Sequence, residues 1–212
     1  ACGDGALRRS LVDELPYDWM GDAEVWGVEA DHVAAAQARS RLEPSRHADV
    51  HVIHGDFLAS VAEEGGQGQL WKPEESHSAF FRTFDIVIAN PPYVRTQVLG
   101  AQTSQRLAAR FGLTGRVDLY HAFWVAMTEA LRIGGVLGII TSNRFLSTLA
   151  GASLRRFLAR AYVIEELIDL GDTKLFDAAI LPAIFIGRRR GAEPPHRPSG
   201  TRRFVKVYTS EE

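Results

Sequence analysis

The chain has 212 residues, of which 46% are hydrophobic and 24% charged. This is the length of one α/β domain with enough apolar material for a full core, which excludes a disordered chain. No apolar run reaches the about 18 residues of a membrane helix, and no secretory signal opens the chain. A single cysteine, Cys2, excludes an internal disulfide and a thiolate zinc site, and the seven histidines lack metal-ligand spacing. We therefore expect no metal, no membrane contact and the reducing cytosol as the default compartment.

The charge is unevenly distributed along the chain. Residues 1–99 hold 8 basic and 16 acidic residues, whereas residues 100–212 hold 16 basic and 10 acidic residues. This asymmetry indicates an anionic partner on the C-terminal side, and ordinary surface variation is the alternative interpretation.

Short β-branched runs alternate with helical patterns along the chain. The strand-like runs are too short to be core helices, and they are nearly continuously apolar. We predict strands over 24–28, 50–54, 84–89, 136–141, 163–169 and 182–186, and helices over 32–42, 119–132 and 152–160. The pattern predicts an α/β fold with a doubly wound, mostly parallel, Rossmann-like sheet and helices on both faces.

Two segments lack this periodicity, and the start of the chain is unusual. Residues 59–78 contain several glycines and predict a long loop, while the proline-rich residues 190–202 predict a linker before a last strand near 204–207. A glycine turn over 1–7 leads into a helix, but no strand precedes it, although such a turn follows the central strand of a doubly wound sheet. We expect a longer polypeptide, or other residues, to supply that strand.

Three acidic or glycine features are expected at the carboxyl edge of the predicted sheet. The turn Cys2-Gly3-Asp4-Gly5 lets a ligand approach the backbone, although a plain tight turn is the commoner explanation for such a fragment. Glu29 ends the next strand, where an acid can accept hydrogen bonds from both ribose hydroxyls. Asp56 and Phe57 follow the strand after it and suit an adenine amine and ring. Together they predict a nucleoside cofactor, and the spacing leaves open a dinucleotide or S-adenosylmethionine.

The strand over 84–89 is followed by Asn90-Pro91-Pro92-Tyr93. The prolines fix the backbone and remove N–H donors, so the segment presents only acceptors. The Asn90 side-chain oxygen and the Pro91 carbonyl can accept both hydrogens of one planar amine, which frees its lone pair for attack on a methyl group. Tyr93 offers an aromatic face for a planar ring. A rigid Pro-Pro loop is the structural alternative.

These motifs resemble the gamma-class adenine-N6 DNA methyltransferases, especially the methylases of type IIG and type I-like restriction–modification enzymes and of BREX-type phage-exclusion systems. The resemblance covers nearly the whole chain. It is carried by Cys2-Gly3-Asp4-Gly5, Val28-Glu29-Ala30-Asp31, Gly55-Asp56-Phe57-Leu58, Asn90-Pro91-Pro92-Tyr93-Val94-Arg95, Asp118-Leu119-Tyr120, Gly134-Gly135-Val136-Leu137 and Leu170-Gly171-Asp172-Thr173-Lys174-Leu175-Phe176. The family's N-terminal cofactor motif, its first-strand carboxylate and its target-recognition domain are absent from these residues.

The resemblance implies S-adenosylmethionine as cofactor and assigns residues along it. These are Ala1 and Gly3 at the methionine part, Glu29 at the ribose, and Ala30, Asp56, Phe57 and Phe123 around the adenine. It implies a catalytic domain over 1–189, with 190–212 forming a linker and the start of a following segment.

The resemblance also implies a pocket for an adenine flipped out of double-stranded DNA. Asn90 and the Pro91 carbonyl would hold the target amine, with Pro92 completing the rigid catalytic motif. Tyr93 would stack on the base, and Phe176 would oppose it.

Arginines on the C-terminal side are candidates for phosphate contacts. Arg106 and Arg110, with Arg116, follow the catalytic motif, and a solvated helix over 103–111 explains them equally well. The run 188–190 is either a phosphate contact or a charged strand exit. The arginines of the 152–160 helix are expected on a solvated face.

The sequence therefore predicts methyl transfer to adenine N6 in a specific DNA sequence, in restriction–modification or phage defence. The implied partners are a target-recognition domain or specificity subunit, in this chain or another, and a nuclease or other defence subunits. Two alternatives remain: a methyltransferase acting on a protein glutamine amide or RNA, and a non-catalytic cofactor-binding or DNA-docking module. A nicotinamide dehydrogenase is disfavoured because the glycine turn lacks its third glycine.

Overall fold

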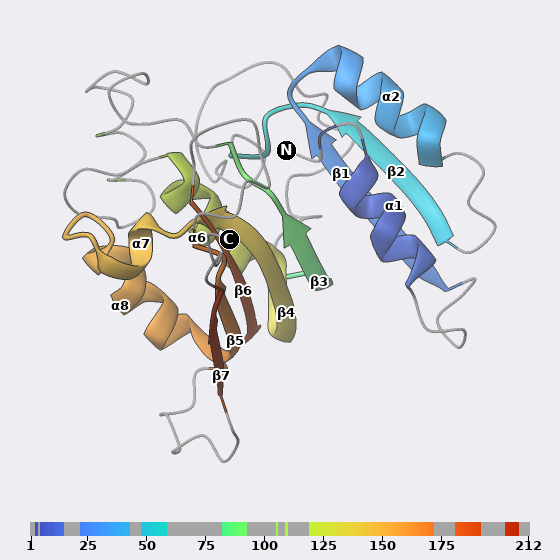
Figure 1. Cartoon of the computed structure of the whole chain (residues 1–212). Helices are drawn as coiled ribbons and strands as arrows, with labels where there is room; N and C mark the ends of the chain where they lie inside the picture. Colours follow the sequence, from blue (N-terminus) through green and yellow to red (C-terminus); the bar gives the residue numbers. More distant parts are fainter. Residues whose placement is uncertain are drawn as a thin grey trace. The chain divides into compact units, whose positions relative to one another are not determined.

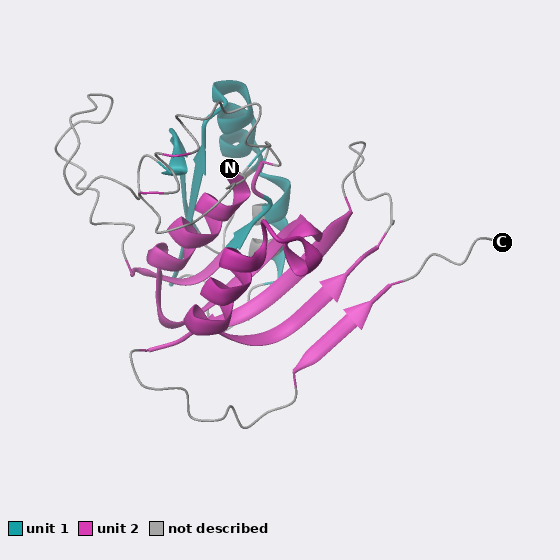
Figure 2. Cartoon of the chain, turned by 90° about the vertical axis from the view of Figure 1, so that its left-hand side faces the viewer, with its two compact units in different colours: residues 1–60, 88–90 teal, residues 61–87, 91–212 magenta. Residues whose placement is uncertain are grey.

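A computed structural model of the chain describes residues 3, 5–14, 22–42, 48–58, 82–92, 105, 109, 119–171, 181–191 and 202–207 (Figure 1). The chain divides into two compact units, coloured separately in Figure 2. Unit 1 holds residues 1–60 and 88–90, and unit 2 holds residues 61–87 and 91–212.

Unit 1 is built on a parallel pair of strands. The described elements are α1 (Ala6–Asp13), β1 (Ala23–Glu29), α2 (His32–Leu42) and β2 (Ala48–His54). The strands pair in register from Ala23↔Ala48 to Glu29↔His54, so both end at the same edge. The core of unit 1 includes Val25 and Val28 of β1 and Ala35 and Ala38 of α2, which are all buried. The small side chains of the two alanines let the helix pack closely on the sheet.

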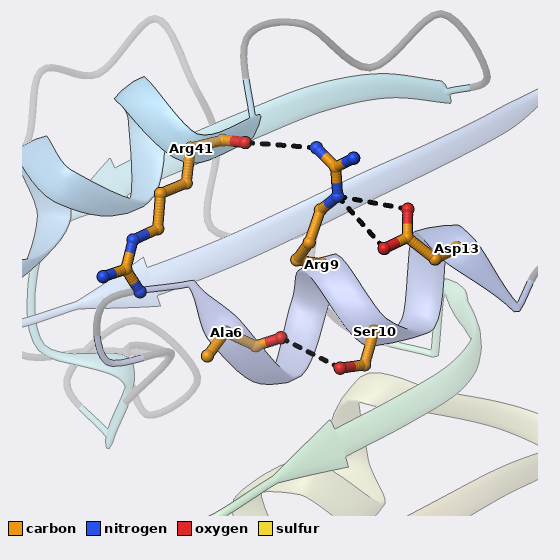
Figure 3. A network of polar contacts seen from close by, with 5 residues as sticks. All are labelled: Ala6, Arg9, Ser10, Asp13 and Arg41. Atoms are coloured by element: carbon orange, nitrogen blue, oxygen red, sulfur yellow. Dashed lines mark hydrogen bonds and ion pairs between the residues drawn. The ribbon is translucent and has the colours of Figure 1, made fainter.

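The helix α1 is amphipathic, and its polar face is linked to α2 (Figure 3). Arg9 Nε forms an ion pair with Asp13 one turn later at 3.1 Å, and Arg9 Nη1 donates to the Arg41 carbonyl at the end of α2. Ser10 Oγ donates to the Ala6 carbonyl at 3.3 Å. Both members of the ion pair are about half exposed, so this network orients the helix more than it stabilises it.

Unit 2 is built on a five-stranded sheet with the order β3-β4-β6-β5-β7. Its strands are β3 (Phe84–Ala89), β4 (Leu131–Ser142), β5 (Tyr162–Asp169), β6 (Pro182–Arg189) and β7 (Arg203–Lys206), and its described helices are α6 (Leu119–Ala130), α7 (Arg144–Ser147) and α8 (Ala152–Ala161). The last residues of β3, 88–89, are grouped with unit 1.

Strand directions in unit 2 combine parallel and antiparallel pairs. Arg82 and Thr83 donate backbone hydrogen bonds to Glu129 and Ala130, so the neighbouring strands β3 and β4 begin at the same edge and run in the same direction. The pair β5–β7 is also parallel, whereas β6 is antiparallel to both β4 and β5. The sequence did not reveal β6 as antiparallel, because a strand buried on both faces has the same apolar pattern in either direction.

The predicted elements agree closely with the described ones. The strand over 84–89 and the helix over 32–42 have the predicted bounds, and the strand expected near 204–207 is β7. The helix predicted over 119–132 ends at Ala130 instead. The extended segment from Leu131 takes its backbone pairing from the sheet, which overrides the helical periodicity there. The loops predicted over 59–78 and 190–202 fall largely outside the described residues.

The core of unit 2 is formed where α6 packs on the sheet. Trp124 of α6 is fully buried and contacts Phe185 edge-on, with ring centroids 4.8 Å apart, and Tyr162 contacts the same Phe185 ring from β5. The Thr128 hydroxyl donates to the Trp124 carbonyl at 2.7 Å, so the Tyr162 hydroxyl must donate to Thr128 Oγ1, 2.6 Å away. Burial raises the pKa of the Tyr162 hydroxyl, so it remains a donor throughout the physiological range.

The direction of this hydrogen-bond chain predicts unequal costs for two substitutions. Thr128→Val leaves the buried Tyr162 hydroxyl without its acceptor and should cost about 1–3 kcal/mol, whereas Tyr162→Phe removes only the outer donor and should cost about 0.5–1.5 kcal/mol. Urea unfolding of the two variants measures both values. An equal cost, or a larger cost for Tyr162→Phe, would contradict the assigned direction.

Candidate functional site

The predicted cofactor acids lie at one edge of unit 1. Glu29 ends β1 and His54 ends β2, and the two are register partners. The Gly55 N–H donates to the Glu29 carbonyl at 2.8 Å, which holds the segment containing Asp56 and Phe57 beside the end of β1. The carboxyl ends of parallel strands are where ligands bind in open α/β sheets.

The Glu29 carboxylate is buried and is held by two backbone donors. The Gly3 N–H donates to Oε2 at 2.7 Å, and the Asp31 N–H donates to Oε1 at 3.1 Å. An ionised carboxylate offers about four lone-pair positions, and these two bonds use two of them. The carboxylate is therefore oriented and retains acceptor capacity for two hydroxyl donors.

The glycine turn that contacts Glu29 depends on its backbone conformation. Gly3 has φ +57°, and among the described residues a Cβ at this position would meet no atom within 4 Å. The positive φ therefore favours glycine here. The glycine turn and Glu29, which the sequence placed separately along the expected cofactor, are joined by a direct hydrogen bond.

Asp31 has a structural role beside this site. Its Oδ1 accepts a hydrogen bond from the Ala34 N–H at 2.8 Å and caps the start of α2. That bond lowers the pKa of the Asp31 carboxyl below its ordinary value, although burial opposes the shift, and the nearby His32 and His54 add smaller contributions. The acid that caps α2 is therefore Asp31, two residues after Glu29.

The segment after β2 presents its predicted residues at the same edge. Asp56 is exposed, and its Oδ1 accepts a hydrogen bond from the Leu58 N–H at 2.9 Å, which shapes a tight turn. Phe57 is half-buried, and Ala30, predicted to lie beside the adenine, is exposed. Glu29, Ala30, Asp56 and Phe57 therefore lie within a few residues of two paired strand ends, and Gly3 joins them through its hydrogen bond to Glu29.

The predicted catalytic motif begins where β3 ends. Asn90 is half-buried and belongs to unit 1 with Glu29 and Asp56. Pro91 is buried and Pro92 is half-buried, and both belong to unit 2. Phe123 is buried in α6 of unit 2. Five predicted site residues, Ala1, Tyr93, Arg106, Arg110 and Phe176, lie outside the described residues.

The arginines at the end of β6 bind a carboxylate and backbone carbonyls of neighbouring segments. Arg188 pairs with Glu165 at 3.0 Å and donates to the Gly134 carbonyl, Arg189 donates to the Leu131 carbonyl, and Arg190 donates to the Tyr162 carbonyl. Burial lowers the pKa of Arg189. Of the two sequence interpretations of 188–190, these contacts favour the charged strand exit.

The prediction that Arg155 lies on a solvated helix face is wrong. Arg155 is half-buried, and its Nη1 donates to the carbonyls of Phe145 and Thr148 at 2.6 and 2.9 Å. It therefore ties α8 to α7. Arg156 and Arg160 are exposed, as expected.

A polar cluster at the ends of β4 and β5 was not found from the sequence. The buried Asp169 accepts hydrogen bonds from Asn143 Nδ2 at 2.9 Å and from the Gly171 N–H at 3.2 Å. Gly171 has φ +59°, and a Cβ there would lie 2.7 Å from the Val207 carbonyl oxygen, so only glycine fits. The signal for Asp169 was its place at a strand end, but no pattern links it to Asn143 across 26 residues.

Residues 25–176 match the family described as Eco57I restriction-modification methylase, which is more than half of the chain. The chain belongs to this family. A similar curated protein is the Type II methyltransferase M.BanIII of Aneurinibacillus aneurinilyticus, 44% identical over 208 residues, which are 98% of this chain and 35% of that protein. Another is the Type II methyltransferase M.XhoI of Xanthomonas vasicola, 32% identical over 76% of this chain and 30% of that protein. The chain thus spans about a third of the length of these relatives.

Solved structures confirm the predicted fold class. A putative class I S-adenosylmethionine-dependent methyltransferase from Listeria monocytogenes has a TM-score of 0.67 and 18% identity, over 98% of this chain and 56% of that one. A modification subunit of a putative type I restriction enzyme from Vibrio vulnificus has a TM-score of 0.63 and 13% identity, over 100% of this chain and 42% of that one. Our Eco57I-family chain has the class I methyltransferase fold, and S-adenosylmethionine is the cofactor that this fold and family imply.

The described residues contain neither a metal-binding cluster nor a helix that could span a membrane. Within the part of the chain that the structure describes, no group of three or more His, Cys, Asp or Glu side chains could hold a metal ion. In the same part, no helix is long and apolar enough to cross a membrane.

The cap at the start of α2 predicts a pH-dependent stability difference. Because the folded-state pKa of Asp31 lies below its ordinary value of 3.8, its contribution is present above pH 4 and is lost as the pH falls through the lowered pKa. At pH 7, Asp31→Ala should lower Tm by about 2–4 °C. Thermal melts from pH 7 to pH 3 should show this difference narrowing.

Asp31→Asn is the matched control for this prediction, because the amide oxygen still caps the helix without titrating. Its Tm difference from the unsubstituted protein should stay small at pH 7. A difference for Asp31→Ala that is constant down to pH 3 would contradict the role of the ionised carboxylate.

Proposed function

We propose that this Eco57I-family chain transfers a methyl group from S-adenosylmethionine to the N6 amine of an adenine in DNA. Restriction-modification methyl transfer is the activity class of the family. The observation that carries the finer proposal is the position of Asn90. It follows β3, is succeeded by two prolines, and belongs to the same compact unit as Glu29 and Asp56.

The candidate site groups of unit 1 fit the implied cofactor. Glu29 is an oriented carboxylate with remaining acceptor capacity, which suits the two ribose hydroxyls. Asp56 supplies an exposed acceptor for the adenine amine, and Phe57 supplies an apolar surface for its ring. Gly3 gives the methionine part close access to the backbone. When bound, S-adenosylmethionine supplies an electrophilic methyl group on a sulfonium centre.

In this proposal, the chain activates the acceptor amine by hydrogen bonding alone. The adenine N6 lone pair is delocalised into the ring, which makes the amine a poor nucleophile. Asn90 and the Pro91 carbonyl accept its two hydrogens and favour the pyramidal geometry in which the lone pair can attack. Because prolines have no N–H, no backbone donor competes at this point. An N–C bond would form as the C–S bond of the donor breaks and S-adenosylhomocysteine leaves, and the nitrogen would lose one proton to water.

The remaining sequence-based assignments are part of the same proposal. Tyr93 would stack on the flipped base and Phe176 would oppose it, while Arg106 and Arg110 would contact phosphates. Phe123 would complete the adenine pocket. We also propose that residues 1–189 form the catalytic domain and that a linker follows it. The proposed location is the bacterial cytoplasm, in association with the nucleoid.

The partners of the whole protein are proposed on the same basis. The curated relatives named as Type II methyltransferases are about three times as long as the matched region. A solved neighbour belongs to the type I R-M system, and another is the type IIG restriction endonuclease BpuSI. We propose that a target-recognition domain or specificity subunit selects the DNA sequence, and that a nuclease is fused or associated.

The direct test uses the full-length protein, tritiated S-adenosylmethionine and unmethylated DNA. We expect label in DNA that is released on digestion as N6-methyl-2'-deoxyadenosine, and Asn90→Ala should slow the reaction by about 100-fold or more. Asn90→Asp retains an acceptor and should keep part of the activity. Cofactor affinity in both variants should equal that of the unsubstituted protein.

Three outcomes would redirect this proposal. Label in protein or RNA instead of DNA would favour a glutamine or RNA methyltransferase. Cofactor binding with no transfer to any of these acceptors would favour a non-catalytic module. Full activity of Asn90→Ala would remove Asn90 from the mechanism.

Glu29 gives an independent binding prediction. Glu29→Ala removes the proposed acceptor of two charge-assisted hydrogen bonds and should raise the Kd of S-adenosylhomocysteine by about 10- to 100-fold in calorimetric titration. Glu24→Ala is the matched control, because Glu24 lies on the same strand and is exposed. An unchanged Kd in Glu29→Ala would exclude Glu29 from the cofactor site.

A further inference from the structure

His54 ends β2 directly opposite Glu29 in the parallel register, and its side chain turns back to the neighbouring strand. His54 Nε2 lies 3.1 Å from the Ala30 carbonyl oxygen. A carbonyl oxygen can only accept a hydrogen bond, so Nε2 carries the hydrogen and donates. The ring of His32, at the start of α2, meets the His54 ring edge-on with centroids 6.3 Å apart.

The acceptor of this bond belongs to the peptide unit that also holds Glu29. The Ala30 carbonyl and the Asp31 N–H are the two ends of one planar group, which turns as a rigid body. At one end the carbonyl accepts from His54 Nε2, and at the other the N–H donates to Glu29 Oε1 at 3.1 Å. A rotation of this peptide would therefore break both hydrogen bonds at once.

The other contacts of Glu29 do not fix this peptide. Gly3 N–H holds the opposite carboxylate oxygen, and Gly55 N–H binds the Glu29 backbone carbonyl. The Ala30–Asp31 peptide lies between the end of β1 and the start of α2, and Ala30 is exposed. His54 thus supplies a side-chain contact at the carbonyl end of this peptide, in addition to the contacts that Asp31 makes with α2.

We propose that His54 is a positioning residue for the cofactor ribose, acting through the Ala30–Asp31 peptide on the Glu29 carboxylate. The inference rests on the proposed role of Glu29 and names a residue that supports it without contacting the cofactor. This role could not be predicted from the sequence, because His54 is an exposed histidine that precedes the Gly55-Asp56-Phe57-Leu58 motif and is not part of it.

The test measures the Kd of S-adenosylhomocysteine for the full-length protein by calorimetry. His54→Leu removes the donor and should raise the Kd about 3- to 10-fold. This is the effect expected of one ordinary hydrogen bond that acts on the ligand indirectly, through Glu29. His54→Gln places an amide N–H at similar reach and should restore most of the affinity. His51→Leu is the matched control, because His51 lies on the same strand, is exposed, and stacks on Trp26.

A double-substitution cycle separates positioning from direct contact. If His54 acts through Glu29, His54→Leu should have little further effect in a Glu29→Ala background. The same fold-loss in both backgrounds would overturn the inference, as would an unchanged Kd in His54→Leu or equal losses in His54→Leu and His54→Gln. Thermal melts of each variant confirm folding before titration.

The same titrations keep the two proposals apart. If Glu29→Ala weakens binding and His54→Leu does not, only the positioning role of His54 fails. If Glu29→Ala leaves the Kd unchanged, the proposed ribose contact fails, and the inference about His54 fails with it.

Discussion

The buried carboxylate of Glu29 constrains the candidate site more than any other group in unit 1. A buried charge is costly unless it is hydrogen-bonded, and Glu29 meets this requirement with backbone donors from two separate segments. Gly3 lies 26 residues before it, and Asp31 follows it by two residues. The glycine turn, the end of β1 and the start of α2 must therefore adopt one mutual arrangement, and that arrangement forms the edge where the candidate cofactor residues lie.

The site is placed by backbone geometry, while unit 2 is held by side-chain packing. In unit 1, the polar contacts that matter run from N–H groups to Glu29, Asp31 and Asp56. In unit 2, Trp124, Tyr162 and Phe185 form an aromatic core, and arginines bind carbonyls at the strand ends. Strand β3 takes part in both units, because its first residues belong to one and its last residues, with Asn90, to the other.

Family membership gives the class of chemistry, and the geometry of the candidate site supports a more specific proposal. The match to the Eco57I restriction-modification methylases establishes the family. The residues refine it: an acceptor-only Asn-Pro-Pro segment suits a planar amine, and an oriented acid at the end of β1 suits a ribose. Adenine N6 in DNA is the planar amine that the proposed experiments test, and the ribose is that of the implied cofactor.

The sequence by itself determined the α/β class, the bounds of β3 and α2, and the identity of Glu29, Asp56 and Asn90 as site candidates. It could do so because strand length, apolar continuity and the residue at a strand end are local properties of the chain. Only the tertiary structure decided that β6 runs antiparallel, that Arg155 binds carbonyls, that Asn143 pairs with Asp169, and that His54 faces the Ala30 carbonyl. Each of these depends on which distant segments become neighbours, and a single sequence contains no local pattern that specifies such pairing.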